Sequence, residues 1–106
     1  SQEEIDRIIQ EAGAMAETDR ALREKVELQN KLASLVRNTQ RSFNEFGGLL
    51  EAEQQEAGER ILSEGEAAAR ADEMGEIRMA LDALERLGRQ LTTAMMKSAG
   101  ENKKDD

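Results

Sequence analysis

The chain contains no proline, and its first 46 residues include no helix-breaking residue other than Gly13. Proline is the strongest helix breaker, whereas one glycine inside a helix costs only about 1 kcal/mol. Ser1 followed by Glu4 fits a capping box, so a helix can begin at once. Residues 3–46 therefore predict one helix of about 66 Å, at about 1.5 Å per residue. A helix of that length must project from its own core, pack on another domain or kink.

The remaining composition also indicates an all-α protein. Tyrosine, tryptophan, cysteine and histidine are absent, and 36% of the 106 residues are charged. Few strand-favouring residues remain, so a sheet has little to be built from. Without cysteine or histidine the chain lacks the usual zinc and iron–sulfur ligands, thiol nucleophiles and imidazole bases. We therefore expect no cofactor, no metal site and no catalytic residues.

The net charge of the chain limits the classes of partner that it can bind. A net charge of -8 argues against binding to nucleic acid or an anionic membrane, because both require a positive surface. No apolar run approaches the roughly 18 residues of a membrane span, and no signal-peptide pattern opens the chain. The first residue is Ser1 rather than Met, so we expect part of a longer protein. Interaction with other proteins remains the favoured role.

Several positions are typical of helix ends. Gly47–Gly48 is the strongest, because glycine adopts the left-handed C-cap conformation without strain. Ala71–Asp72 is the second, since Asp72 can cap a following helix. Gly100 is the third, and residues 99–106 predict a frayed, disordered tail. The polar stretch Glu17–Arg20 contains two helix-starting residues, so we expect a kink or a short break there.

The apolar residues divide into two sets. One set marks a face at the start of the long helix and comprises Ile5, Ile8, Ile9, Ala12 and Ala16. The other set predicts a small antiparallel three-helix bundle over residues 28–98. Its expected core comprises Leu28, Leu32, Leu35, Phe43, Phe46, Ile61, Ile77, Leu81, Leu84 and Leu91. This bundle has no need of the first face, which either docks elsewhere or folds back as a fourth bundle helix.

The residues of the first face resemble the lid of the seventy-kilodalton heat-shock chaperones of DnaK type. The resemblance begins with the run Glu3-Glu4-Ile5-Asp6-Arg7-Ile8-Ile9-Gln10-Glu11-Ala12 and continues through Ala16-Glu17-Thr18-Asp19-Arg20. Residues 30–32 and 38–47 are similar to the long lid helix of that family. Residues 77–95 are similar to its last bundle helix, so the resemblance spans residues 1 to about 98.

The resemblance implies an organisation and a function. Residues 1–16 would be the first lid helix, which docks on a β-sandwich substrate domain, and residues 17–47 would be the long lid helix. Residues 48–98 would complete the bundle. The lid would cover the peptide-binding groove and slow release of unfolded client polypeptide, under ATP control from a separate domain. This part would be non-catalytic, and ATP and Mg would bind only elsewhere in the intact protein.

The resemblance also implies partners and a source. Besides its own β-sandwich domain, the lid would work with client peptides, J-domain co-chaperones and nucleotide-exchange co-chaperones. Apart from the resemblance, the uncovered apolar stripe predicts an antiparallel homodimer centred on residues 5–26, as a by-product of truncation. The tail, residues 103–106, lacks the Glu-Glu-Val-Asp ending of eukaryotic cytosolic members, which favours a bacterial or organellar source. Of these, a cytoplasmic bacterial protein is preferred.

Polar latch contacts are expected at Asp19, Arg20 and Arg37. Asp19 and Arg20 match the family pattern, whereas Ala33 and Arg37 stand where bacterial members have an acid and a histidine. Closure is therefore expected to be weaker or differently paired. The alternative that the residues leave open is a generic helical or coiled-coil adaptor, dimeric through residues 5–46.

Overall fold

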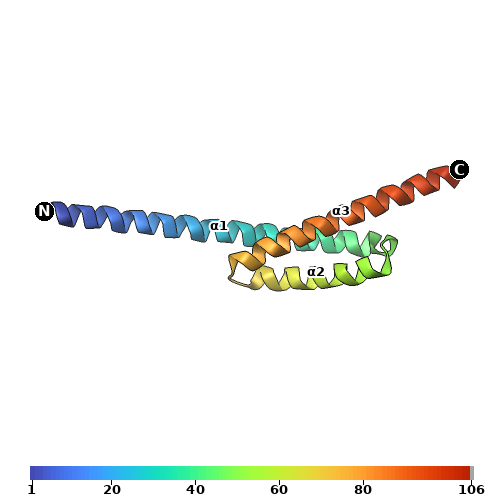
Figure 1. The fold of residues 1–106 in the computed structure, drawn as a ribbon, viewed down its shortest axis with the longest axis horizontal. Coiled ribbons are helices and arrows are strands. Elements are labelled where there is room, and N and C mark those ends of the chain that lie inside the picture. Colours follow the sequence, from blue (N-terminus) through green and yellow to red (C-terminus); the bar gives the residue numbers. More distant parts are fainter. Residues whose placement is uncertain (106) are drawn as a thin grey trace.

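Three α-helices and one short 3-10 helix make up the part of the chain that the structure describes (Figure 1). They are α1 (Gln2–Phe46), η1 (Gly47–Leu49), α2 (Ala52–Arg70) and α3 (Met74–Asp105). The computed structural model describes the backbone of residues 1–105 and the side chains of residues 1–101. Within that range no strand occurs, so the predicted all-α class is confirmed. The molecule measures 83 × 24 × 17 Å, because α1 and α3 both extend beyond the bundle.

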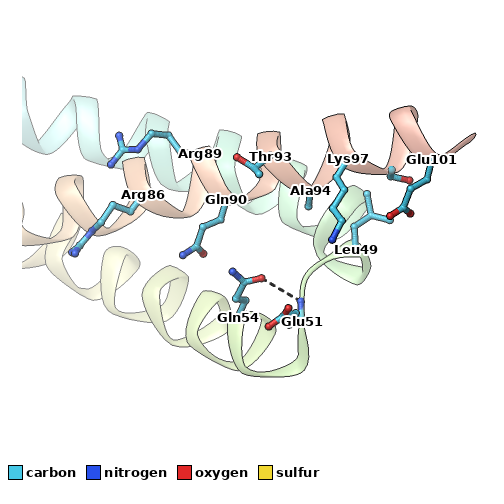
Figure 2. Close-up of a pocket in the computed structure, with 11 residues that line it drawn as sticks. Leu49, Glu51, Gln54, Arg86, Arg89, Gln90, Thr93, Ala94, Lys97 and Glu101 are labelled. Atoms are coloured by element: carbon cyan, nitrogen blue, oxygen red, sulfur yellow. Dashed lines mark hydrogen bonds between the residues drawn. The ribbon is translucent and has the colours of Figure 1, made fainter. Parts of the chain in front are cut away.

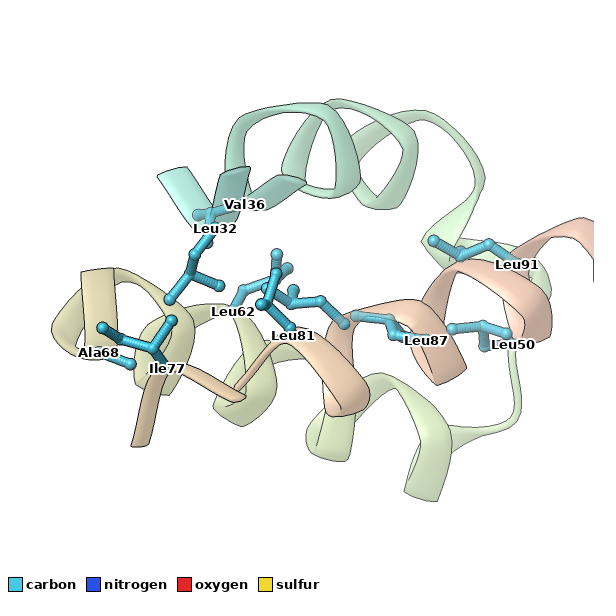
Figure 3. Close-up of a cluster of buried hydrophobic side chains, with 10 residues drawn as sticks. Leu32, Val36, Leu50, Leu62, Ala68, Ile77, Leu81, Leu87 and Leu91 are labelled. Atoms are coloured by element: carbon cyan, nitrogen blue, oxygen red, sulfur yellow. The ribbon is translucent and has the colours of Figure 1, made fainter. Parts of the chain in front are cut away.

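The second half of α1 packs with α2 and α3 as a three-helix bundle (Figure 1). α2 runs back along α1, and α3 then returns across both helices. Leu32, Ile77 and Leu84 are fully buried where the three helices meet. The bundle agrees with the predicted architecture. The buried apolar side chains, shown in Figure 3, are Leu32, Val36, Leu50, Leu62, Ala68, Ile77, Leu81, Leu84, Leu87 and Leu91.

The expected core residues occupy two shells of this bundle. The buried ones are Leu32, Ile77, Leu81, Leu84 and Leu91. The half-buried ones pack against that core and are Leu28, Leu35, Phe43, Phe46 and Ile61. The other buried residues are Leu50, Leu62, Ala68 and Leu87, which the helical spacing places on or beside the apolar faces, and Val36, which it did not single out.

Two glycines bring α2 close to its neighbours. A Cβ atom built on Gly58 would lie 2.5 Å from Cε2 of Phe43, which is closer than atoms pack. A Cβ atom on Gly65 would lie 3.1 Å from Cδ1 of Leu84 and 3.1 Å from Cγ2 of Val36. The absence of side chains at both positions therefore sets the spacing of the bundle.

The predicted break at Glu17–Arg20 does not form, because α1 is one helix from Gln2 to Phe46. Figure 1 shows no sharp bend there. The Thr18 hydroxyl, expected to favour a new start, instead donates to the carbonyl oxygen of Ala14 at 2.9 Å. Such a bond within the helix leaves the main-chain ladder intact. No other described element contacts this stretch, so nothing bends it.

The end of α1 also differs from expectation in its geometry. Gly47 follows the helix as predicted, but its φ of −59° and ψ of −29° are right-handed rather than left-handed. No described residue has a positive φ. A Cβ atom on Gly47 would lie 3.3 Å from Cδ2 of Phe43, so this glycine serves close packing against the ring. The chain then continues through η1 before it reverses.

The other two predicted ends also need correction. α3 is capped by Glu73 rather than Asp72, because the Glu73 carboxylate accepts the N–H groups of Gly75 and Glu76 at 3.1 and 3.2 Å. α3 then passes through Gly100 and continues to Asp105, so residues 99–105 are helical rather than disordered. One glycine costs a helix about 1 kcal/mol, and no proline follows to end it. Asp106, the last residue of the predicted tail, lies outside the described residues.

Candidate functional site

The first half of α1 stands free of the bundle. Residues 1–24 are all exposed. Figure 1 shows this part of α1 projecting from the bundle, so it does not fold back as a fourth bundle helix. Ile5, Ile8 and Ile9 keep 51%, 64% and 63% of their surface accessible. Met15, which the sequence analysis did not single out, extends the same surface. We call this surface the N-terminal apolar face and define it as Ile5, Ile8, Ile9, Ala12, Met15 and Ala16.

The N-terminal apolar face points away from the bundle. Successive residues of an α-helix are rotated by about 100°. By this arithmetic the face is centred about 150° around α1 from Leu32, Val36 and Thr39, the buried residues of this helix. The two halves of α1 therefore present opposite sides, one to the bundle and one to solvent. An exposed apolar stripe of this kind marks a surface that binds something else.

Polar contacts fix α1 where it leaves the bundle. Gln29 Nε2 donates to the carbonyl oxygen of Ala71 at 3.1 Å, and Lys25 forms an ion pair with Asp72. A second ion pair joins the middle of α1 to the first turns of α3, with 3.6 Å between Oε1 of Glu24 and Nη2 of Arg78. These contacts tie α1 to the α2–α3 connection. We call them the junction and define it by Glu24, Lys25, Gln29, Ala71, Asp72 and Arg78.

The expected latch residues do not come together. Asp19 and Arg20 are exposed on the projecting half of α1 and form no ion pair with another described side chain. Arg37 lies about 26 Å further along the helix, at about 1.5 Å per residue. Its guanidinium donates to the Ser34 hydroxyl at 3.3 Å. Any latch formed by these residues would need groups from outside the chain.

A groove of about 540 Å³ lies between the start of α2 and α3 (Figure 2). Glu51 and Gln54 line one side, where the Glu51 N–H donates to Oε1 of Gln54 at 3.3 Å. Arg86, Arg89 and Lys97 line the other. The groove is open, and it holds no nucleophile paired with a base. The sequence analysis did not find it, because its two sides are more than 30 residues apart in the chain.

Metal-binding clusters and membrane-spanning helices are both absent from the described residues. No group of three or more aspartate, glutamate, histidine or cysteine side chains could hold a metal ion. No described helix combines the length and the hydropathy that crossing a membrane requires.

Comparison with known protein families shows which family this chain is related to. The family model described as Hsp70 protein matches residues 1–97. The chain belongs to the Hsp70 family. This confirms the resemblance to the seventy-kilodalton heat-shock chaperones, and it favours an Hsp70 chaperone over a generic helical adaptor. The three helices fit a C-terminal helical fragment of Hsp70. No solved structure matches the chain.

Proposed function

We propose that this chain is the lid of a DnaK-type Hsp70, which covers the peptide-binding groove and slows release of unfolded client polypeptide. The exposed N-terminal apolar face carries the proposal. The face would dock on the β-sandwich substrate domain, and ATP bound in a further domain would control its release. The chain itself would be non-catalytic, and the latch residues would pair with the rim of the β-sandwich.

The energetics of the apolar face support docking. Burial of an isoleucine side chain stabilises a complex by up to about 1.5–3 kcal/mol. Ile5, Ile8 and Ile9 are each about half exposed or more, so docking can still bury most of that surface. A gain of a few kcal/mol suits a contact that must both hold and release. The bundle does not use these residues, so docking costs it nothing.

The shape of the molecule supports the same role. α1 is continuous from the N-terminal apolar face to the bundle, and the junction fixes its direction. A docked face would therefore hold the second half of α1 and the bundle in one place over a groove. Implied partners are client peptides and the J-domain and nucleotide-exchange co-chaperones, in a bacterial cytoplasm.

The proposal can be tested by substituting residues of the N-terminal apolar face in the intact chaperone. Serine at Ile5, Ile8 and Ile9 together should speed release of a fluorescent peptide in the ADP state. The increase should be roughly tenfold for each 1.4 kcal/mol of docking free energy lost. The matched control places serine at Arg7, Gln10 and Ala14, on the other side of the same turns, and should leave the release rate unchanged.

Two results would count against the proposal. Equal release rates for the two triple variants would show that the face does not dock. Loss of the bundle in the isolated chain carrying the isoleucine changes, measured by circular dichroism, would show that the face belongs to the fold.

A further inference from the structure

The projecting half of α1 carries a seven-residue repeat. Apolar residues at the first and fourth positions of each heptad form the seam of a coiled coil. Asp19 is the one polar residue at such a position between residues 5 and 26. The first positions are Ile5, Ala12, Asp19 and Val26, and the fourth positions are Ile8, Met15 and Leu22. All seven side chains are exposed, so about three heptads of seam have no partner among the described residues.

We propose that a second copy of this chain occupies the seam as an antiparallel coiled coil. In the register that fits, each residue faces the one whose number brings their sum to 27. Ile5 then faces Leu22 of the other copy, and Ala12 faces its Met15. This register overlays residues 2–25 of the two copies over about 36 Å. It ends where the bundle begins, because the junction starts at Glu24.

The charges of the segment favour the antiparallel direction. Residues 1–13 carry four acidic side chains and one arginine, a net of −3, whereas residues 14–26 carry three of each sign, a net of zero. Antiparallel pairing places the acidic half beside the neutral half. Parallel pairing would place the two acidic halves together, and like charges repel.

Individual side chains favour the same direction. In a parallel pair the two Asp19 carboxylates would face each other across the seam. In the antiparallel pair each Asp19 faces Ile8 instead, so the two carboxylates are kept apart. Ile9 also lies beside Ala16 of the other copy, which widens the apolar contact. In a parallel pair Ile9 would lie beside Glu4.

The pairing does not depend on the proposed lid function. It uses the same N-terminal apolar face, so in an intact chaperone docking and pairing would exclude each other. A face released from the β-sandwich would be open to a second copy. A failure of the pairing test would leave docking untouched, and a failure of docking would leave the pairing untouched.

Cysteine cross-linking tests the register, because the chain contains no cysteine. One preparation carries Ile5→Cys and another carries Leu22→Cys, and the two are mixed near about 1 mM under mild oxidation. The expected result is a disulfide-linked heterodimer in the mixture. Neither preparation alone should cross-link, since equal positions in the antiparallel pair lie about 26 Å apart.

A matched pair tests specificity. Gln10→Cys and Glu17→Cys also sum to 27, but they lie on the opposite side of α1, so their mixture should not cross-link. Homodimers of either seam variant alone would show a parallel pair and overturn the proposal. Cross-linking by the control mixture, or none by any mixture, would equally overturn it and leave the seam to another partner. Sedimentation equilibrium of the unmodified chain should show the mass of two copies at high concentration, and that mass should be lost in Met15→Asp, which places a charge opposite Ala12 at the centre of the seam.

Discussion

Replacement of Leu84 by alanine should destabilise the bundle severely. Leu84 is fully buried on α3, and its Cδ1 lies 3.1 Å from the point where a Cβ atom of Gly65 would stand. Loss of a buried leucine costs about 2–5 kcal/mol, depending on how well neighbours fill the cavity. Gly65 has no side chain to move in, and Val36 is β-branched and stiff. We therefore expect a cost in the upper half of that range.

The cost of this substitution is large relative to the free energy of unfolding of the whole bundle. At about 0.05–0.15 kcal/mol per residue, some 70 residues have a free energy of unfolding of about 4–11 kcal/mol. Urea denaturation followed by far-ultraviolet circular dichroism measures the change, since the chain has no tryptophan or tyrosine to report by fluorescence. With a slope of about 1–1.5 kcal/mol per molar urea, the midpoint should fall by about 2–5 M.

Met79 provides the matched control. It lies on the same helix but is 73% exposed, so Met79→Ala should change the free energy of unfolding by less than about 0.5 kcal/mol. Equal midpoints for the Leu84→Ala and Met79→Ala variants would refute the packing argument. They would show that α3 does not hold its buried face against the other two helices.

Three further substitutions test the packing of α2 and α3 and the junction. Gly88→Ala should stabilise the chain by up to about 1 kcal/mol, because an added Cβ atom meets nothing within 4 Å, whereas Gly58→Ala should destabilise it by about 1–2 kcal/mol through overlap with the Phe43 ring. Urea midpoints that shift in the same direction for both variants would contradict this. Gln29→Ala removes the bond to the Ala71 carbonyl and should lower the free energy of unfolding by about 1 kcal/mol in the same assay. An unchanged midpoint would show that the bond contributes nothing.

Helical periodicity was sufficient to predict the class, the three helices and the bundle. The spacing of Leu32 on α1 and of Ile77, Leu84 and Leu91 on α3 follows one helical face, and all four are buried. Periodicity works here because each helix is amphipathic and long. Periodicity did not show which residues beside the main apolar stripe, such as Leu87, are fully buried, because burial there depends on where the third helix crosses.

Capping preferences predicted ends less well than periodicity predicted faces. Thr18 and Asp19 can start helices, but α1 continues through both of them. No other described element contacts the helix there to bend it. Asp72 seemed the natural cap of α3, yet it pairs with Lys25, and Glu73 caps the helix instead. Sequence alone could not decide this, because the competing partner lies 47 residues away.

The absence of a joint in α1 gives the molecule the mechanics of a lever. Between Ile9, on the N-terminal apolar face, and Thr39, in the bundle, the helix rises about 45 Å at about 1.5 Å per residue. A tilt of about 10° at one end would swing the other by about 8 Å, close to the distance between the axes of two packed helices. A slight change in the seating of three isoleucines at one end thus becomes a displacement of several ångströms at the other. No hinge residue has to flex for that travel to occur.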